Sequence, residues 1–237
     1  MIDRVRAARR DPGMAVLEGF HSLKHALRFG ADVEAVAAVD PRDLERLARE
    51  LAPDLAGRLK GLAVEVTRDE LRQLAPGPLR TGVVAIARRP RVDVAAVVAD
   101  ARAAPLVVLE DPRDLGNLGA AVRVAAAADA AGVLTTGAHD PWDAAALRGS
   151  AGLHYALPVA RVEAVEPGDR PLVAVDPEGE VLAGIPPRAM LAFGSERHGL
   201  GDDLLARADA RLRIPMRPGV SSLNLATAVA AVLFARR

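Results

Sequence analysis

The chain lacks cysteine and is poor in aromatic residues and in lysine. Its 237 residues include no cysteine, which excludes disulfides, thiolate metal sites and cysteine nucleophiles. Aromatic residues make up 3%, so the core has to be built from alanine, valine and leucine. The lysines are Lys24 and Lys60, so nearly all of the positive charge is carried by arginine. The chemistry of this protein therefore rests on groups other than thiols.

A long hydrophobic segment is also missing. The longest apolar run, residues 225–235, is too short to span a bilayer, which needs roughly 20 residues. The first ten residues include Asp3 and four arginines and lack the apolar core of a secretion signal. With 51% hydrophobic and 26% charged residues, the chain can bury a core and stay soluble. We expect a soluble, cytoplasmic protein without a membrane partner.

The net charge is zero, which argues mildly against a nucleic-acid partner, because phosphate contacts require arginine or lysine. Arginines nevertheless cluster in residues 4–10 and in residues 88–91. A local basic patch matters more for nucleic-acid binding than the sum of charges. Each cluster can equally be an ordinary solvated face, and the sequence leaves both interpretations open.

Strand-like and helix-like segments alternate along the whole chain. In the first part, strands are predicted at residues 14–17, 33–39, 62–66 and 83–87, and a helix at 41–51. In the second part, strands are predicted at residues 106–109, 131–135, 172–175, 189–193 and 210–214, and helices at 118–129, 202–208 and 222–236. Strands that are apolar throughout suit burial on both faces, and their alternation with helices predicts an α/β fold with a parallel sheet.

Pro90 interrupts the alternation, and a predicted helix at residues 94–103 leads into the next strand. We place the boundary between two domains there. The prediction is a small α/β domain at residues 1–90, a linker at 91–104 and a larger domain at 105–237.

A first motif follows the strand at residues 106–109. Gly116 and Gly119 allow a close approach of the backbone to a ligand, and the helix that begins near Leu118 presents free N–H groups. Arg123 lies further along this alanine-rich helix, where it has few local partners; an ion pair to Asp114 or Asp111 is the structural alternative. The glycine spacing does not fit the dinucleotide-binding pattern.

Two further motifs follow later strands. Gly194 and Gly199 bracket Glu196, a carboxylate that could accept hydrogen bonds from a ribose or orient an arginine, although a plain turn explains the pattern too. The segment 214–220 is a proline-rich loop that cannot form regular structure, and Ser222 and Asn224 open the last helix. A serine N-cap is compatible with a loop whose backbone groups clasp an adenine.

His21 and His25 have a spacing that suits a metal on a helix, but no third ligand accompanies them. We expect no metal site.

The order and spacing of the three motifs resemble those of the SPOUT-class RNA 2′-O-ribose methyltransferases, the TrmH/SpoU family, across residues 105–237. Residues 17–21 and 81–85 resemble, more loosely, the small α/β RNA-binding domain that often precedes this catalytic domain. The resemblance implies a trefoil knot in the parallel-sheet methyltransferase domain, a homodimer with shared active sites, and S-adenosylmethionine as the cofactor. It implies cofactor binding at Gly194, Ile214, Met216 and Leu223, and catalytic positions at Asn117, Arg123, Glu196, Ser222 and Asn224.

The activity that follows from the resemblance is methyl transfer from S-adenosylmethionine to a ribose 2′-hydroxyl in RNA. Ribosomal RNA is favoured over transfer RNA, because the N-terminal part resembles that of members acting on ribosomal RNA. One specialised form would protect its producer from an antibiotic that targets the ribosome. The alternatives are a transfer RNA methyltransferase and a catalytically silent knotted protein that binds RNA or assists assembly. A nucleotide-dependent dehydrogenase lacks its glycine fingerprint here.

Overall fold

The structure is a computed structural model that describes residues 1–75, 77 and 79–235. The chain divides into two compact units: unit 1 contains residues 1–91 and 142–156, and unit 2 contains residues 92–141 and 157–237. The sequence predicted a linker at residues 91–104 and one continuous domain after it. In the structure unit 2 begins at Val92, and the chain returns to unit 1 for fifteen residues. That return is not marked by any break in the sequence pattern.

Unit 1 is built around a mixed four-stranded sheet with the strand order β1-β4-β2-β3. β4 is antiparallel to both β1 and β2, and β2 is parallel to β3. Its strands and helices are α1 (Ile2–Ala8), β1 (Met14–Glu18), α2 (Phe20–Arg28), β2 (Val33–Ala38), α3 (Pro41–Leu51), η1 (Pro53–Leu55), α4 (Ala56–Leu59), β3 (Ala63–Glu65), α5 (Arg68–Leu74), β4 (Val83–Arg88), α8 (Ala144–Gly149) and η2 (Leu153–Tyr155).

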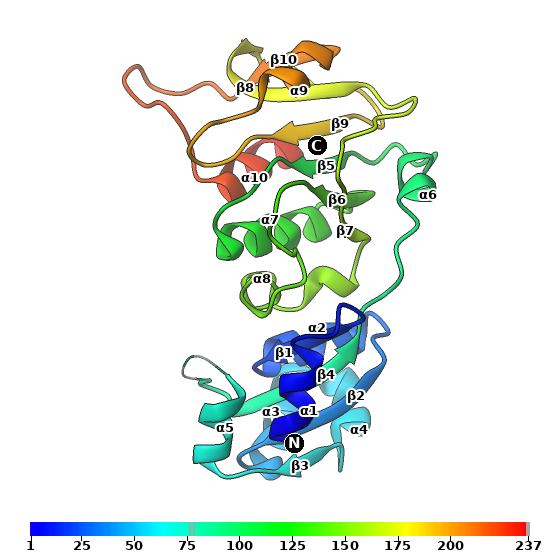
Figure 1. Ribbon diagram of the computed structural model, residues 1–237, viewed down its shortest axis with the longest axis vertical. Helices are drawn as coiled ribbons and strands as arrows, with labels where there is room; N and C mark the ends of the chain where they lie inside the picture. The colour runs from blue at the N-terminus through cyan, green and yellow to red at the C-terminus, as the bar shows by residue number, and fades with distance from the viewer. Residues whose placement is uncertain (76, 78, 236–237) are drawn as a thin grey trace. The chain divides into compact units, whose positions relative to one another are not determined.

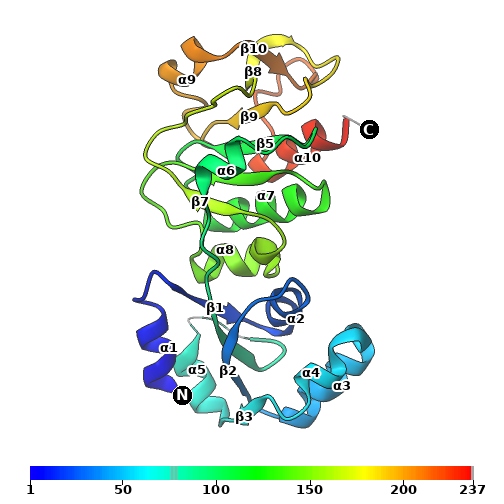
Figure 2. The same cartoon turned by 90° about the vertical axis from the view of Figure 1, so that its right-hand side faces the viewer.

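Helices cover both faces of this sheet (Figure 2). Val5 of α1 and Leu74 of α5 pack with Val16, Ala37 and Val84, which point to one side of three strands. On the other side α2 contacts β1 and β4, and α8 contacts β1. Successive residues of a strand point to opposite sides of the sheet. Because helices cover both sides, β1 is buried along its whole length.

A buried carboxylate attaches the returning segment to unit 1. Glu18, at the end of β1, is only 3% exposed. It accepts hydrogen bonds from Arg9 at 2.7 Å and from Arg148 of α8 at 2.5 Å. A buried charge is tolerated only when it is paired in this way. The ion pairs therefore help to explain why residues 142–156 belong to unit 1.

Some arginines of the two clusters seen in the sequence form ion pairs within the unit. Arg9 is bound to Glu18, and Arg88 lies 2.5 Å from a carboxylate oxygen of Glu34.

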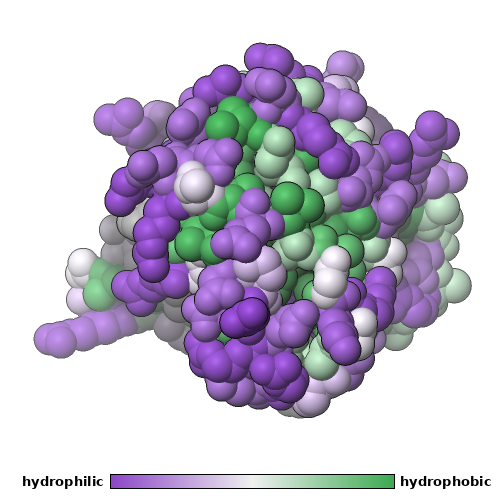
Figure 3. Space-filling model, turned by 90° about the horizontal axis from the view of Figure 1, so that it is seen from below, coloured by the Kyte–Doolittle hydropathy of each residue, from purple (hydrophilic) through white to green (hydrophobic). Residues whose placement is uncertain are grey.

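The end of this unit that carries β3 and the N-terminus has hydrophobic residues at its centre, ringed by hydrophilic ones (Figure 3). Val64, on the edge strand β3, is 60% exposed. The clusters are therefore not an unbroken basic surface.

Unit 2 is an all-parallel six-stranded sheet with the order β10-β8-β9-β5-β6-β7, which confirms the predicted parallel α/β fold (Figure 1). β5, β6 and β9 are buried at every residue, as their apolar sequences require. Its strands and helices are α6 (Val94–Val98), β5 (Leu106–Leu109), α7 (Leu115–Ala127), β6 (Gly132–Thr135), β7 (Val159–Arg161), β8 (Leu172–Val181), β9 (Met190–Phe193), α9 (Asp202–Arg207), β10 (Ala210–Arg213) and α10 (Leu225–Ala235).

The ends of two helices differ from the prediction because of their caps. α7 begins at Leu115, three residues before the predicted start, and the Asp114 side chain accepts a hydrogen bond from the N–H of Asn117. α10 begins at Leu225 and not at Ser222, because the Asn224 side chain accepts from the N–H groups of Ala226 and Thr227. The prediction of a serine N-cap is therefore wrong. α10 packs against α7.

No helix among residues 1–75, 77 and 79–235 is long and apolar enough to cross a membrane. Within the same residues, histidines and carboxylates are nowhere gathered in a group of three or more that could hold a metal ion. His25 is instead hydrogen-bonded through Nδ1 to the carbonyl of Ala151, 2.7 Å away. Burial lowers its pKa, which favours the neutral ring as the donor in that bond.

Candidate functional site

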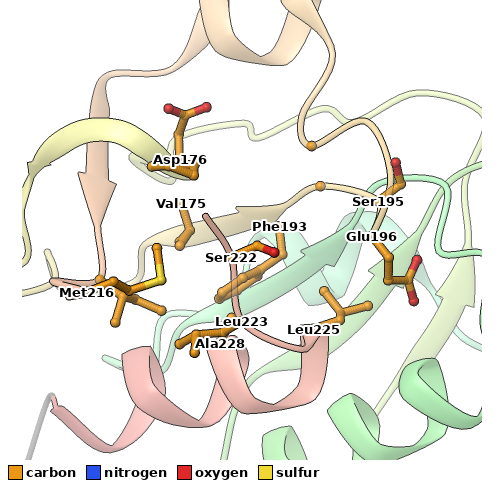
Figure 4. Close-up of a pocket in the computed structure, with 14 residues that line it drawn as sticks. Val175, Asp176, Phe193, Ser195, Glu196, Met216, Ser222, Leu223, Leu225 and Ala228 are labelled. Atoms are coloured by element: carbon orange, nitrogen blue, oxygen red, sulfur yellow. The ribbon is translucent and has the colours of Figure 1, made fainter. Parts of the chain in front are cut away.

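The carboxyl ends of the parallel strands in unit 2 meet at one edge of the sheet, where α/β folds bind ligands. An open cavity of about 670 Å³, counted out to its solvent-exposed mouth, lies there. Its walls come from the middle of β8, from the end of β9 and the loop after it, from the loop after β10 and from the start of α10 (Figure 4). Segments from three separate parts of the chain thus form one concave surface.

The loop after β9 has a backbone geometry that demands glycine. A Cβ on Gly194 would lie 1.9 Å from the carbonyl carbon of Gly199, a distance that no side chain can accept. Ser195 and Gly199 exchange two backbone hydrogen bonds of 3.0 Å, and Gly199 has a φ of +67°. Glu110, at the end of β5, fixes the next residues by accepting from the N–H of Gly201 at 2.6 Å. The loop is therefore rigidly shaped.

The lining of this first cavity is mostly apolar and carries negative but no positive side chains. Phe193, Met216 and Leu223 form much of the wall (Figure 4). Asp176 and Glu196 lie at opposite sides of the cavity, and neither lysine nor arginine is among its described lining residues. Such a cavity suits a flat apolar group that is joined to a positive charge.

All four residues that the sequence assigned to cofactor binding line the cavity, namely Gly194, Ile214, Met216 and Leu223. The cavity is also lined by Val175, Asp176 and Phe193, which the sequence motifs did not predict. A signal for them existed, because each lies at or near the carboxyl end of a predicted strand.

A second cavity, of about 900 Å³ out to its open mouth, adjoins the first. It is lined by Arg113, Asp114, Asn117, Glu196, Arg197 and His198. The two cavities share Glu196, and the second has charged and amide groups where the first has hydrocarbon. Two molecules bound in the two cavities would approach each other at that carboxylate.

Three of the predicted polar residues form one chain of hydrogen bonds. Asn224 donates through Nδ2 to Oδ1 of Asn117 at 2.8 Å, and Asn117 donates through Nδ2 to Glu196 at 3.1 Å. The direction of this chain is fixed, because Oδ1 of Asn224 already accepts the N–H groups that cap α10. Glu196 must then be the acceptor, as an ionised carboxylate is.

The pKa of Glu196 agrees with this direction. Partial burial alone would raise the pKa, but hydrogen bonds from its own N–H, from Asn117 and from the N–H groups of Arg113 and Asp114 together lower it. Glu196 is therefore an anion at neutral pH and a weak proton acceptor. Its geometry suits holding a hydroxyl or a cation in place rather than removing a proton.

Two predicted catalytic residues lie outside this chain. Ser222 lines the first cavity (Figure 4), but Arg123 lines neither cavity in its own chain. Arg123 is exposed on α7, and its side chain has no hydrogen bond or ion pair to another described residue. The alternative ion pairs to Asp111 and Asp114 do not form, since Asp111 binds Arg113 at 2.7 Å and Asp114 caps α7.

A parallel α/β unit with two adjoining cavities at its carboxyl edge defines a domain that brings two ligands together. The family model for the SpoU rRNA Methylase family matches residues 104–234, and the chain belongs to this family.

Similar proteins agree with that membership. The chain is 37% identical to an uncharacterized tRNA/rRNA methyltransferase of Mycobacterium bovis, over 81% of this chain and 71% of the relative. It is 28% identical to the 23S rRNA (adenosine(1067)-2′-O)-methyltransferase of Streptomyces azureus, over 100% and 90% of the two chains. Among solved structures, an AdoMet-bound rRNA methyltransferase from Sinorhizobium meliloti has a TM-score of 0.76 and 25% identity, covering 100% of this chain and 93% of that one.

Proposed function

We propose that this protein transfers a methyl group from S-adenosylmethionine to the 2′-hydroxyl of a ribose in RNA, with ribosomal RNA as the substrate. The observation that carries the proposal is the carboxylate of Glu196, which is shared by two cavities of opposite character. Family membership and the 2′-O-methyltransferase relative that matches the whole chain support the reaction type.

The first cavity fits the methyl donor. S-Adenosylmethionine supplies an electrophilic methyl group on a sulfonium ion. The apolar walls of Ile214, Met216 and Leu223 suit the adenine, and Gly194 permits close backbone contact. Asp176 and Glu196 place negative charge around a ligand whose sulfonium and amino groups are positive. These residues bind and orient the donor; the reaction gains most from this alignment.

The second cavity suits the acceptor ribose. Glu196 and Asn117 are placed to hold a hydroxyl between the two cavities, and Ser222 and Asn224 shape the adjoining wall and loop. Because the pKa of Glu196 is lowered, this carboxylate orients the hydroxyl, and the hydroxyl proton leaves to water or to a substrate phosphate. Arginine keeps its proton at any working pH, so Arg123 stabilises the developing alkoxide and is not the base.

The position of Arg123 supports a homodimer in which this residue serves the partner's site. Arg123 is exposed and lines neither cavity of its own chain. We further propose the trefoil knot of the family in unit 2, RNA binding by unit 1 and a cytoplasmic location.

Subunit mixing tests where Arg123 acts. Arg123→Ala keeps the donor cavity, whereas Gly194→Ala blocks it and keeps the arginine. If Arg123 acts across a dimer, mixing the two inactive variants under subunit exchange restores up to about a quarter of the wild-type methylation rate. If it acts within its own chain, the mixture stays inactive.

The proposed function is tested by two measurements on the full chain. Calorimetry is expected to detect one S-adenosylmethionine per chain, and Leu223→Glu is expected to abolish the binding. Incubation with unmodified 23S ribosomal RNA and transfer RNA transcripts, followed by mapping of 2′-O-methyl groups, is expected to mark one ribosomal nucleotide. A mark on transfer RNA would correct the substrate class. Donor binding with no methylation of either RNA would refute the activity.

A further inference from the structure

The tip of the loop after β9 carries two basic side chains that the reaction described above does not use. Arg197 and His198 follow Glu196 directly and line the second cavity. Both are exposed, and neither packs into the core.

The other charged groups of this cavity are already satisfied within the chain. Asp114 accepts from the N–H of Asn117, and Glu196 accepts from Asn117 and from the N–H of Arg113. Arg113 is paired with Asp111. In contrast, the side chains of Arg197 and His198 form no hydrogen bond or ion pair with any described residue. The cavity therefore has two basic side chains without a partner among the described residues, whereas its carboxylates already accept hydrogen bonds within the chain.

The loop holds these donors in a defined place. Its base is closed by the two hydrogen bonds between Ser195 and Gly199, and the N–H of His198 donates to Oγ of Ser195 at 3.3 Å. The donors consequently lose little backbone entropy when they bind a ligand, and a preformed group of donors that includes a guanidinium favours a multiply coordinated anion.

We propose that Arg197 and His198 bind a phosphodiester of the RNA, next to the ribose that Glu196 and Asn117 hold. This proposal rests on the proposed function and adds the residues that position the acceptor strand. A guanidinium presents paired donors that match two phosphate oxygens, and an imidazole adds a third donor. A phosphate flanks every ribose of an RNA strand on each side. An anion site next to the ribose site therefore matches the spacing of ribose and phosphate along the RNA.

The test compares Arg197→Ala and His198→Ala with Arg211→Ala, a matched control. Arg211 is exposed on β10 and lines neither cavity, and its side chain has no hydrogen bond or ion pair to another described residue. Binding of the 23S ribosomal RNA transcript is measured against salt concentration, and S-adenosylmethionine binding by calorimetry. For Arg197→Ala we expect RNA affinity to fall about tenfold and the logarithmic salt slope to shrink by about 0.7–0.9. Cofactor affinity stays within about twofold, and Arg211→Ala matches the wild type in both.

Three outcomes overturn the proposal. Unchanged RNA affinity in Arg197→Ala shows that the guanidinium is merely solvated. A parallel loss of S-adenosylmethionine affinity assigns Arg197 to the carboxylate of the cofactor. An equal loss in Arg211→Ala shows that only overall charge matters. RNA binding tests the phosphate contact even if the wild type methylates nothing. Failure of the phosphate proposal is therefore distinguishable from failure of the proposed methyltransferase activity.

A chemical change in the RNA identifies the phosphate. In the shortest fragment that the wild type binds, single phosphates are replaced by neutral methylphosphonates. The replacement at the contacted phosphate is expected to weaken wild-type binding about tenfold and Arg197→Ala binding hardly at all. If no replacement loses its effect in the variant, Arg197 does not contact a phosphate.

Discussion

The two cavities at the carboxyl edge of unit 2 differ in how they are built. The first has apolar walls and a shape imposed by backbone geometry, above all at Gly194. The second is made of charged and amide side chains held by one another, with Glu196 common to both. The first should therefore respond most strongly to changes of shape, and the second to changes of hydrogen bonding and charge.

The largest effect is expected from shape in the first cavity. Gly194→Ala forces the loop apart, because its Cβ would collide with the backbone of Gly199 and Leu200. We expect S-adenosylmethionine affinity to fall on the order of 100-fold. Gly184→Ala, where a Cβ meets nothing within 4 Å, is the matched control and should bind normally. Calorimetry measures both; normal binding by the Gly194 variant would mean that the loop shape is dispensable.

A smaller effect is expected from the hydrogen bonds that join the two cavities. Asn224→Asp keeps the oxygen that caps α10 but can no longer donate to Asn117. Turnover is expected to fall about tenfold to 100-fold with little change in melting temperature. Asn224→Ala loses the cap as well, which costs about 1 kcal/mol of stability.

Steady-state methylation and thermal melting separate the two Asn224 variants. If Asn224→Asp kept the wild-type turnover, the donor of Asn224 would have no role beyond capping.

Charge in the first cavity is expected to have a more modest effect. Asp176→Asn removes one of its two carboxylates. Affinity for S-adenosylmethionine should fall about threefold to tenfold, whereas affinity for the thioether product, which lacks the sulfonium charge, should hardly change. Glu178→Gln, exposed on the same strand outside the cavity, is the control. Equal losses for both ligands would assign Asp176 to a part that they share.

The smallest effect is expected from the titration of Glu196. Its lowered pKa means that its hydrogen bonds stabilise the fold fully above the unfolded pKa of about 4.3, and that this stability is lost as the pH falls through the folded value. Glu196→Gln should be less stable than the wild type at neutral pH, and the difference should shrink in acid. Urea unfolding at pH 7 and pH 3 measures it; a constant difference would mean that the carboxylate is not ionised in the folded state.

The strands of unit 2 could be predicted from sequence because each is apolar and bounded by turn residues. β5 has the predicted bounds, and β9 ends at the predicted residue, Phe193. In contrast, β8 continues beyond its predicted end to Val181, through polar residues that carry no strand pattern. α6 ends at Val98, five residues before the predicted end. Local periodicity marks buried segments well and exposed extensions poorly.

The helix starts were harder to predict, because a cap depends on which side chain reaches the free N–H groups. Asp114, Asn224 and Ser222 are all residue types that cap helices. Only the folded backbone selects Asp114 for α7 and Asn224 for α10. The same selection leaves Ser222 free to line the first cavity.

By itself the sequence determined the parallel α/β architecture of unit 2 and the three segments that form its ligand edge, since hydrophobic runs and glycines are local signals. Only the tertiary structure decided that Asn117, Glu196 and Asn224, separated by up to 107 residues, form one directed chain. It also decided that Arg123 lies outside both cavities and that residues 142–156 return to unit 1. These outcomes depend on which distant side chains satisfy one another's hydrogen bonds and charges, and no local pattern encodes that pairing.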